Sequence, residues 1–363
     1  MHPRTMPTFR RSRGADMGEV LRMDRPAPGE LDALLRVAEQ GAPSASDFAA
    51  LVAAEQPVVL RGLVDRWPAV AAGQTAAGLI AYLKAMDRGI SAPVMEAPAK
   101  SGGRFAYGPD LSEFNFTKRR APIRETLDRI ERNLGQANAP FVAIQMLPLA
   151  DSLPGFVTRN PMPLLSADIG PRLWIGGPIR TQTHNDRDHN LACVIAGRRR
   201  FVLFPPEQVA NLYVGPLDNP PPLSLVDPEA PDLERFPKYA DAIAQAQVAW
   251  LEPGDALFMP KYWWHHVTSL EPFNAMANYW WGDDATGLER PNDIFLAALL
   301  AFKHLPAGER DYWRAMFAAH VFGGHDDAAA HIPEELRGAL GRMTPRQRAS
   351  LRQQLMMAFL KNS

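Results

Sequence analysis

Cysteine is almost absent from this chain, since Cys193 is the one cysteine among 363 residues. A single cysteine excludes an internal disulfide framework and a zinc site built on several thiolates, and it is typical of a reducing compartment. The chain also lacks an uninterrupted apolar run of about 18 residues, and no apolar stretch of signal-peptide length follows the arginines near its start. We therefore expect a cytoplasmic location, with no membrane span and no export signal.

An excess of charge of one sign is lacking as well. The chain carries 39 basic and 40 acidic side chains, so its formal net charge is −1. No overall field favours nucleic acid or an acidic membrane, and no basic segment interleaved with aromatic residues indicates nucleic-acid binding. With 46% hydrophobic residues the chain can bury a sizeable core. Specificity must come from a local site.

The pattern of apolar residues divides the chain into parts. Residues 1–28 mix Arg, Pro and Gly without periodicity and predict a loose N-terminal arm. The segment that follows predicts a helix capped near Ser44 or Ser46, a short buried strand in PVVLRG, and an amphipathic helix over residues 122–134. Short apolar runs then alternate with turn signals, as in a sandwich or small barrel: FVAIQML, RLWIGG, NLACVIAG, RRFVLFPP, QVAWLEPGD, ALFMP and NAMANYWW.

Two further segments flank or interrupt these strands. The Pro-rich insert, residues 216–237, predicts a long surface connection without strands, because adjacent prolines cannot join a ladder. Residues 286–363 predict helices, and the last of them begins with a capping box in which Thr344 is the N-cap and Gln347 the N3 residue. This terminal helix either packs on its own domain or pairs with a second subunit.

Candidate metal ligands stand in TQTHNDRDHN. On a strand, His184 and Asp186 point to the same face, but two ligands are not a site and a lone H-x-D is a weak signal. Downstream, PKYWWHHV places His265 and His266 on another strand, where only one of the two can face the first pair. Two histidines and one carboxylate form the facial triad of non-haem Fe(II) oxygenases. His189 is odd-spaced from the first pair and predicts a rim residue.

The stretch from Thr181 to Trp281 resembles the JmjC-type, cupin-like Fe(II)/2-oxoglutarate-dependent dioxygenases, a family that includes the asparaginyl hydroxylase factor inhibiting HIF. The matching motifs follow in the same order: THND, Asn190, GRRRFVLFPP, NLY, ERFP, PGDALFMPKYWWHHV and ANYWW. The resemblance extends more faintly to EQPVVLRGLVDRWPAV and RFAYGPDLSEFNF. An ordered set of this kind is far more specific than any single motif.

The resemblance implies a mainly β fold with flanking helices, namely a double-stranded β-helix (jelly roll) with N-terminal α/β elements and a C-terminal helical region. It places the catalytic domain in residues 29–285 and a dimerisation region in residues 286–363. It also selects His184, Asp186 and His265 as the Fe(II) ligands, so that His266 faces outward or supports the site from behind.

The resemblance further implies a 2-oxoglutarate site. Arg199 stands where the family usually has the lysine that binds the distal carboxylate, and Thr181 matches a hydroxyl donor to the same group. Asn190 and Asn278 match polar residues near the co-substrate and metal, and Trp280 matches an aromatic wall. The exchange of lysine for arginine is not neutral, because arginine is longer and fork-shaped. A tyrosine of the family has no counterpart in PFVAIQML, and Arg198 and Arg200 predict exposed charges on the opposite strand face.

The implied reaction uses Fe(II), O2 and 2-oxoglutarate to hydroxylate a C–H bond, with release of succinate and CO2. A protein or peptide side chain is the expected substrate, with a small molecule as the alternative, and the Pro-rich insert would form a groove wall. Two other hypotheses stay open: a catalytically silent cupin-like binding protein, and a metal cupin that acts on a small molecule without 2-oxoglutarate.

Overall fold

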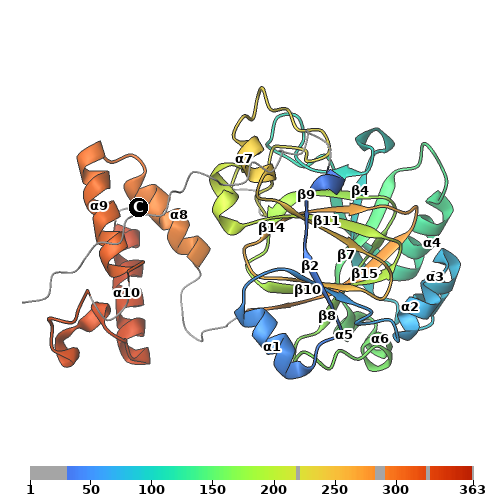
Figure 1. Ribbon diagram of the computed structural model, residues 1–363, viewed down its shortest axis with the longest axis horizontal. Coiled ribbons are helices and arrows are strands. Elements are labelled where there is room, and N and C mark those ends of the chain that lie inside the picture. The colour runs from blue at the N-terminus through green and yellow to red at the C-terminus, as the bar shows by residue number, and fades with distance from the viewer. Residues whose placement is uncertain (1–30, 218–220, 283–290, 324–327, 362–363) are drawn as a thin grey trace, which may run out of the picture. The chain divides into compact units, whose positions relative to one another are not determined.

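The computed structural model describes residues 31–217, 221–282, 291–323 and 328–361 (Figure 1). The chain divides into two compact units, Met1–Gly282 and Asp283–Ser363. The arm predicted for residues 1–28 lies outside the described residues. A search of the described helices finds none that is both long and apolar enough to cross a membrane.

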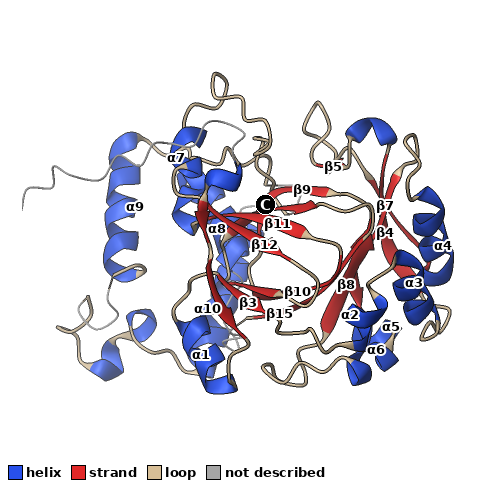
Figure 2. Ribbon diagram, turned by 45° about the vertical axis from the view of Figure 1, so that its right-hand side comes forward, coloured by secondary structure: helices blue, strands red, loops and turns tan. Residues whose placement is uncertain are grey.

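The first unit contains two β-sheets that face each other (Figure 2). The smaller sheet has the order β1 (Leu35–Arg36), β12 (Gln247–Leu251), β11 (Arg199–Phe204), β14 (Trp264–Ser269), β9 (Arg180–Asn185) and β5 (Arg104–Phe105). The larger has the order β2 (Ala38–Gly41), β3 (Val58–Arg61), β13 (Ala256–Met259), β10 (His189–Ala196), β15 (Asn274–Trp281), β8 (Pro171–Gly176), β7 (Phe141–Pro148), β4 (Ser91–Ala97) and β6 (Thr117–Pro122). The predicted mainly β, jelly-roll architecture is confirmed.

Strand β10 shows how the sequence builds these layers. It is buried at every position, so both of its faces contact other parts of the protein. Leu191, Cys193 and Ile195 pack on the helix-covered side of the large sheet, whereas Ala192 and Val194 point into the space between the sheets. A single strand therefore contributes to two cores, because its alternate residues point to opposite faces of the sheet.

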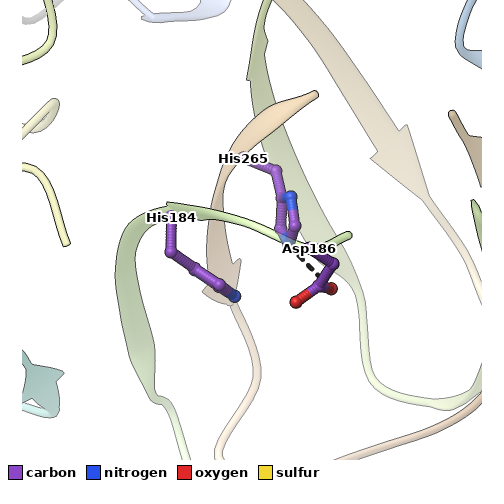
Figure 3. A group of neighbouring side chains, drawn as sticks. All are labelled: His184, Asp186 and His265. Carbon is purple, nitrogen blue, oxygen red and sulfur yellow. Dashed lines mark ion pairs between the residues drawn. The ribbon is translucent and has the colours of Figure 1, made fainter. Parts of the chain in front are cut away.

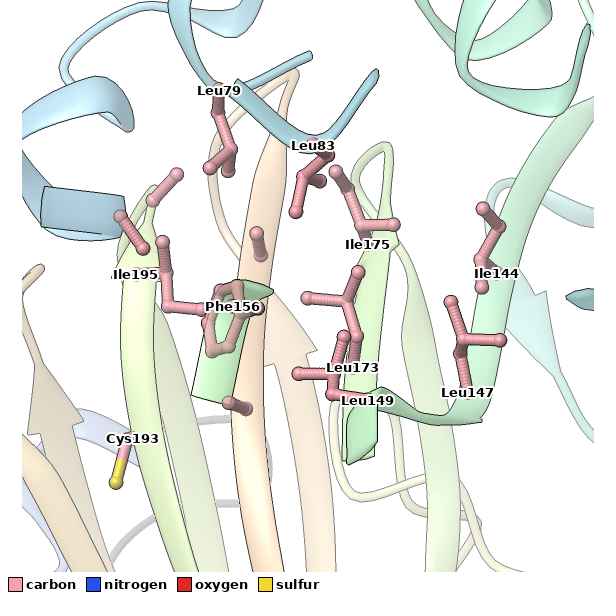
Figure 4. Close-up of a cluster of buried hydrophobic side chains, with 14 of the residues drawn as sticks. Leu79, Leu83, Ile144, Leu147, Leu149, Phe156, Leu173, Ile175, Cys193 and Ile195 are labelled. Carbon is pink, nitrogen blue, oxygen red and sulfur yellow. The ribbon is translucent and has the colours of Figure 1, made fainter. Parts of the chain in front are cut away.

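Helices cover the outer face of the large sheet (Figures 2 and 4). They are α1 (Ala45–Ala53), α2 (Pro68–Ala72), α3 (Ala76–Lys84), α4 (Ile123–Asn133), α5 (Leu149–Ser152) and α6 (Pro154–Arg159). Leu79 and Leu83 of α3 and Phe156 of α6 are fully buried in this core. The predicted N-cap is confirmed at Ser44, whose hydroxyl accepts a hydrogen bond from the Asp47 N–H over 3.2 Å.

The outer face of the small sheet is covered by the Pro-rich insert and by α7 (Tyr239–Ile243). The prediction of a purely surface connection was wrong, because Val226 and Phe236 of the insert are buried against β11 and β14, and Leu223 is buried as well. The insert is also hydrogen-bonded to the small sheet, since the Ser224 N–H donates to the Thr183 carbonyl of β9 over 2.8 Å. It is therefore part of the fold's outer layer.

The same layer corrects the expectation that Arg200 is exposed. Alternation does turn Arg200 away from Arg199, but its side chain is only 10% exposed beneath the insert. Its guanidinium donates to Glu229 of the insert and to Asp32. Thr268 also donates to Glu229, over 3.0 Å. Arg198, by contrast, is exposed as predicted and pairs with Glu271 over 2.7 Å.

The second unit is helical, as predicted, with α8 (Pro291–Phe302), α9 (Ala307–His320) and α10 (Pro345–Lys361). The capping box of α10 is present, because the Gln347 N–H donates to the Thr344 hydroxyl over 3.3 Å and the Thr344 N–H donates to the Gln347 side chain over 2.8 Å. Large apolar side chains of α10 are exposed, including Met356, Phe359 and Leu360.

Replacing the partly buried carboxylate of Glu229 in the insert should destabilise the fold in a pH-dependent way. Burial alone would raise the pKa of Glu229, but His266 and Arg200 outweigh it and lower the pKa to about 2. A lowered carboxyl pKa stabilises the fold above its unfolded pKa of about 4.3, and this stabilisation is lost as the pH falls towards 2. We expect Glu229→Gln to reduce the free energy of unfolding at pH 7 by about 1–3 kcal/mol, and by less at pH 3.

Urea unfolding at the two pH values measures this difference. Glu234→Gln is the matched control, because Glu234 lies in the same insert and is exposed. Equal effects of the two substitutions at pH 7 would show that the ion pair between Arg200 and Glu229 does not hold the insert in place.

Candidate metal centre and anion pocket

Two neighbouring strands bring the predicted metal ligands together. His184 of β9 lies directly opposite His265 of β14 in the antiparallel register, and Asp186 follows β9 immediately. One ligand atom from each of the three residues lies within 4.8 Å of the others. The side chains point toward one another, with 3.8 Å between His265 Nε2 and Asp186 Oδ2 (Figure 3). Within the described part of the chain, this is the one such group of histidine, cysteine and acidic residues.

A β-bulge places Thr181 on the same side of the sheet as His184. The register steps two residues along β14, from His265 to Val267, while it steps three along β9, from His184 to Thr181. The extra residue shifts the alternation of β9, so that Thr181 and His184 both line the cavity between the sheets. In an undistorted strand, residues three apart would face opposite ways.

Backbone carbonyls fix the state of both imidazoles. His184 Nδ1 lies 2.9 Å from the Gln182 carbonyl, and His265 Nδ1 lies 3.1 Å from the Trp263 carbonyl. A carbonyl can only accept, so each Nδ1 carries a proton, and in the neutral form of each imidazole Nε2 presents the lone pair. Burial, and then the neighbouring His184, lower the pKa of His265 to about 4, so its imidazole is neutral at neutral pH. These are the states that metal ligation requires.

Arg199 lines the same cavity and is almost fully buried. Among the described residues it has no carboxylate partner, and its Nε lacks any hydrogen-bond acceptor. Burial lowers the pKa of Arg199 to about 10, so the side chain remains charged at neutral pH. An unpaired buried cation is costly, and the cost is removed if an anion enters the cavity. A larger hollow of about 880 Å³ lies elsewhere, beside Pro205 and Tyr262, and none of the three clustered residues lines it.

The other residues singled out from the sequence also line this cavity, namely Asn190, Asn278 and Trp280. Sequence analysis missed four polar or aromatic lining residues, Gln145, Trp174, Phe201 and Ser269. Their strands were recognised, but strand parity gives only the face that each residue occupies and not that it lines a site. Ser269 is opposite Arg199 in the sheet register, and Trp174 donates its indole N–H to Asn278.

The prediction for His189 was wrong, whereas the one for His266 agrees with the structure. His189 is not a rim residue: it is 4% exposed and lies against the rings of Phe258 and Trp281. The chain bends between Asp186 and His189, where β10 begins. The alternation of β9 therefore does not predict which way His189 points. His266 faces away from the cavity, as expected, and is buried beneath the insert 3.7 Å from Glu229.

Comparisons with known proteins identify the family of the first unit's domain. A family model described as a cupin-like domain matches residues 44–287, which is more than half of the chain. Lysine-specific demethylase JMJ31 of Arabidopsis thaliana is 39% identical over 103 residues, 28% of this chain and 19% of that protein. HSPB1-associated protein 1 of Homo sapiens is 38% identical over 112 residues, 30% of this chain and 22% of that protein.

The name of a third relative refers to tRNA. tRNA wybutosine-synthesizing protein 5 of Gallus gallus is 31% identical over 159 residues, 40% of this chain and 45% of that protein. The chain thus spans less than half the length of each of these relatives. From the family match and the two facing sheets, the chain belongs to the cupin-like, JmjC-type domain family.

Proposed function

We propose that this protein is an Fe(II)- and 2-oxoglutarate-dependent dioxygenase that hydroxylates a C–H bond. Members of its family typically use this metal and co-substrate. The observation that carries the proposal is the cavity itself, in which a cluster of two imidazoles and a carboxylate shares one space with an unpaired buried guanidinium. One half of that space suits a metal ion and the other half suits an anion.

The donor set of His184, Asp186 and His265 fits Fe(II). Two neutral imidazole nitrogens and one carboxylate oxygen are the ligands of the facial triad, which leaves three positions for co-substrate and oxygen. When bound, Fe(II) with 2-oxoglutarate and O2 would supply the oxidising power for hydroxylation, with release of succinate and CO2. The Gln182 and Trp263 carbonyls hold the two imidazoles in the ligating tautomer.

Arg199 would anchor the distal carboxylate of 2-oxoglutarate. Its fork of N–H donors can bind a carboxylate through two parallel hydrogen bonds, and burial strengthens such a charged pair. Thr181 and Ser269 line the same part of the cavity and can add hydroxyl donors. Trp280 and Phe201 line it with rings that help to exclude water. Asn190 and Asn278 would face the metal-binding end of the co-substrate.

A protein or peptide side chain is the substrate that we propose. Two of the relatives carry the names of a lysine-specific demethylase and of a protein associated with HSPB1, which supports a polypeptide substrate. The name of a third relative refers to tRNA, but the near-neutral charge of this chain favours a protein over nucleic acid. A small molecule stays the alternative, and a cytoplasmic location stays a prediction based on the single cysteine.

Purified protein should bind 2-oxoglutarate and turn it over. We expect anaerobic addition of 2-oxoglutarate to the Fe(II)-loaded protein to produce a charge-transfer absorption band, and oxygen to then yield succinate, more of it with a peptide pool. His184→Ala should abolish both signals because one of three ligands is lost. His304→Ala, at an exposed site in the second unit, should leave both unchanged. Metal binding without any band or succinate would instead favour a silent or 2-oxoglutarate-independent cupin.

Arg199 should control co-substrate affinity. Removing a charged hydrogen-bond donor costs about 1.5–3 kcal/mol, so Arg199→Gln should raise the half-saturating 2-oxoglutarate concentration by about 10- to 100-fold. Arg199→Lys keeps the charge and should have a smaller effect. Arg198→Gln is the matched control, because Arg198 is adjacent but exposed on the other strand face. If Arg199→Gln and Arg198→Gln both titrate like the unaltered protein, Arg199 does not bind the co-substrate.

We also propose that the C-terminal helices form a homodimer. The exposed apolar side chains of α10 support this proposal, although packing on its own chain would cover them equally well. Truncation before Thr344 should convert a dimer into a monomer, as light scattering would measure. The same subunit count for both chains would rule out dimerisation through α10.

A further inference from the structure

A chain of three hydrogen bonds leads from an indole to the candidate metal ligand Asp186. The Trp174 Nε1–H donates to Asn278 Oδ1, and Asn278 Nδ2 donates to Asn190 Oδ1 over 3.2 Å. Asn190 Nδ2 then donates to Asp186 Oδ2 over 3.5 Å. Both asparagines are almost fully buried, at 1% and 4% exposure, so water does not replace these partners.

Strand register brings the three side chains into this row. Asn278 of β15 pairs with Arg172 of β8, so Trp174 is its diagonal neighbour on the same face of the sheet. On the other side Asn278 pairs with Ala192 of β10, so Asn190 is the second diagonal neighbour. The row therefore crosses three adjacent strands and ends at the loop that follows β9.

The two ends of the row determine the direction of every bond within it. An indole N–H can only donate and a carboxylate can only accept, whereas an amide can do either after a half-turn of its side chain. Trp174 thus holds Asn278 with its oxygen toward the indole and its NH2 toward Asn190. Asn190 must in turn present its oxygen to Asn278, which leaves its own NH2 facing Asp186.

We propose that Trp174 is a positioning residue that fixes the orientation of the Asp186 carboxylate through Asn278 and Asn190. The inference rests on the proposed function only in taking Asp186 as a metal ligand. Rotation of an aspartate carboxylate about its last bond is soft, so the side chain needs a directional partner to hold it. Without the indole donor, only the 3.5 Å hydrogen bond to the carboxylate holds the two amides in this direction, so Asn190 is held less firmly and orients Asp186 less well.

Trp174→Phe tests this role because it removes the donor and keeps an aromatic ring. Hydrogen-bond partners of metal ligands typically contribute about 10- to 100-fold to metal affinity, and we expect a loss of that size for Mn(II). Titration of the apo protein with Mn(II) by electron paramagnetic resonance, without co-substrate or oxygen, measures it. Trp250→Phe is the matched control, because Trp250 lies on the small sheet and its Nε1 has no acceptor among the described residues.

A second measurement separates positioning from general loosening of the cavity. In ¹⁵N-labelled protein, Zn(II) binding should shift the indole N–H resonance of Trp174, because the bond chain is polarised from its Asp186 end. The Trp250 resonance should not move. If Trp174→Phe does not fold, Asn278→Leu interrupts the row at its centre with similar volume, and the same loss of Mn(II) affinity is expected.

The outcomes separate the two proposals. Unchanged Mn(II) affinity in Trp174→Phe, or in Asn278→Leu where the first variant does not fold, overturns the positioning role and leaves the dioxygenase proposal intact. A Trp174 resonance that stays in place while Zn(II) binds overturns it as well. Failure of the unaltered protein to bind either metal would contradict the metal centre, and with it both proposals.

Discussion

Strands that are buried on both faces are the constraint on which the rest of this structure depends. Each of them must send alternate side chains into two different environments, and a polar residue on either face needs a partner or a ligand. In β11 the aromatic and aliphatic residues satisfy both cores, while the consecutive Arg199 and Arg200 are carried into opposite layers. The fold can accept two buried guanidinium groups only because the two layers surround them differently, one with carboxylates and the other with a cavity.

The charges of the two arginines have different surroundings. Arg200 is neutralised within the protein, by Glu229 from the insert and by Asp32. Arg199 has no such partner among the described residues and faces a cavity that also contains the imidazole–carboxylate cluster. The first arrangement stabilises the outer layer of the small sheet. The second holds a charge ready for an anion, which is a property of a binding site rather than of a core.

The cluster itself depends on departures from regular structure. The bulge in β9 turns Thr181 and His184 to one side, and Asp186 stands beyond the strand end, where the row of amides reaches it. The groups that hold the two imidazoles are backbone carbonyls, which any residue provides. The positions of these carbonyls depend on the local backbone geometry alone. Precision at the site therefore comes from strand pairing and from a few directional hydrogen bonds.

The sequence alone determined the β-rich centre, the flanking helices and the helix caps at Ser44 and Thr344, because apolar periodicity and cap residues are local signals. Together with the ordered motifs it also predicted which histidines and which aspartate would meet. It could not predict β4 and β6, whose residues SAPVMEA and TKRRAP lack a regular apolar alternation. Only the tertiary structure decided that Arg200 and His189 are buried and that Trp174 reaches the site through two asparagines. Burial of a charge and the direction of a side-chain amide depend on what other segments place beside them, and strand parity carries no information about those neighbours.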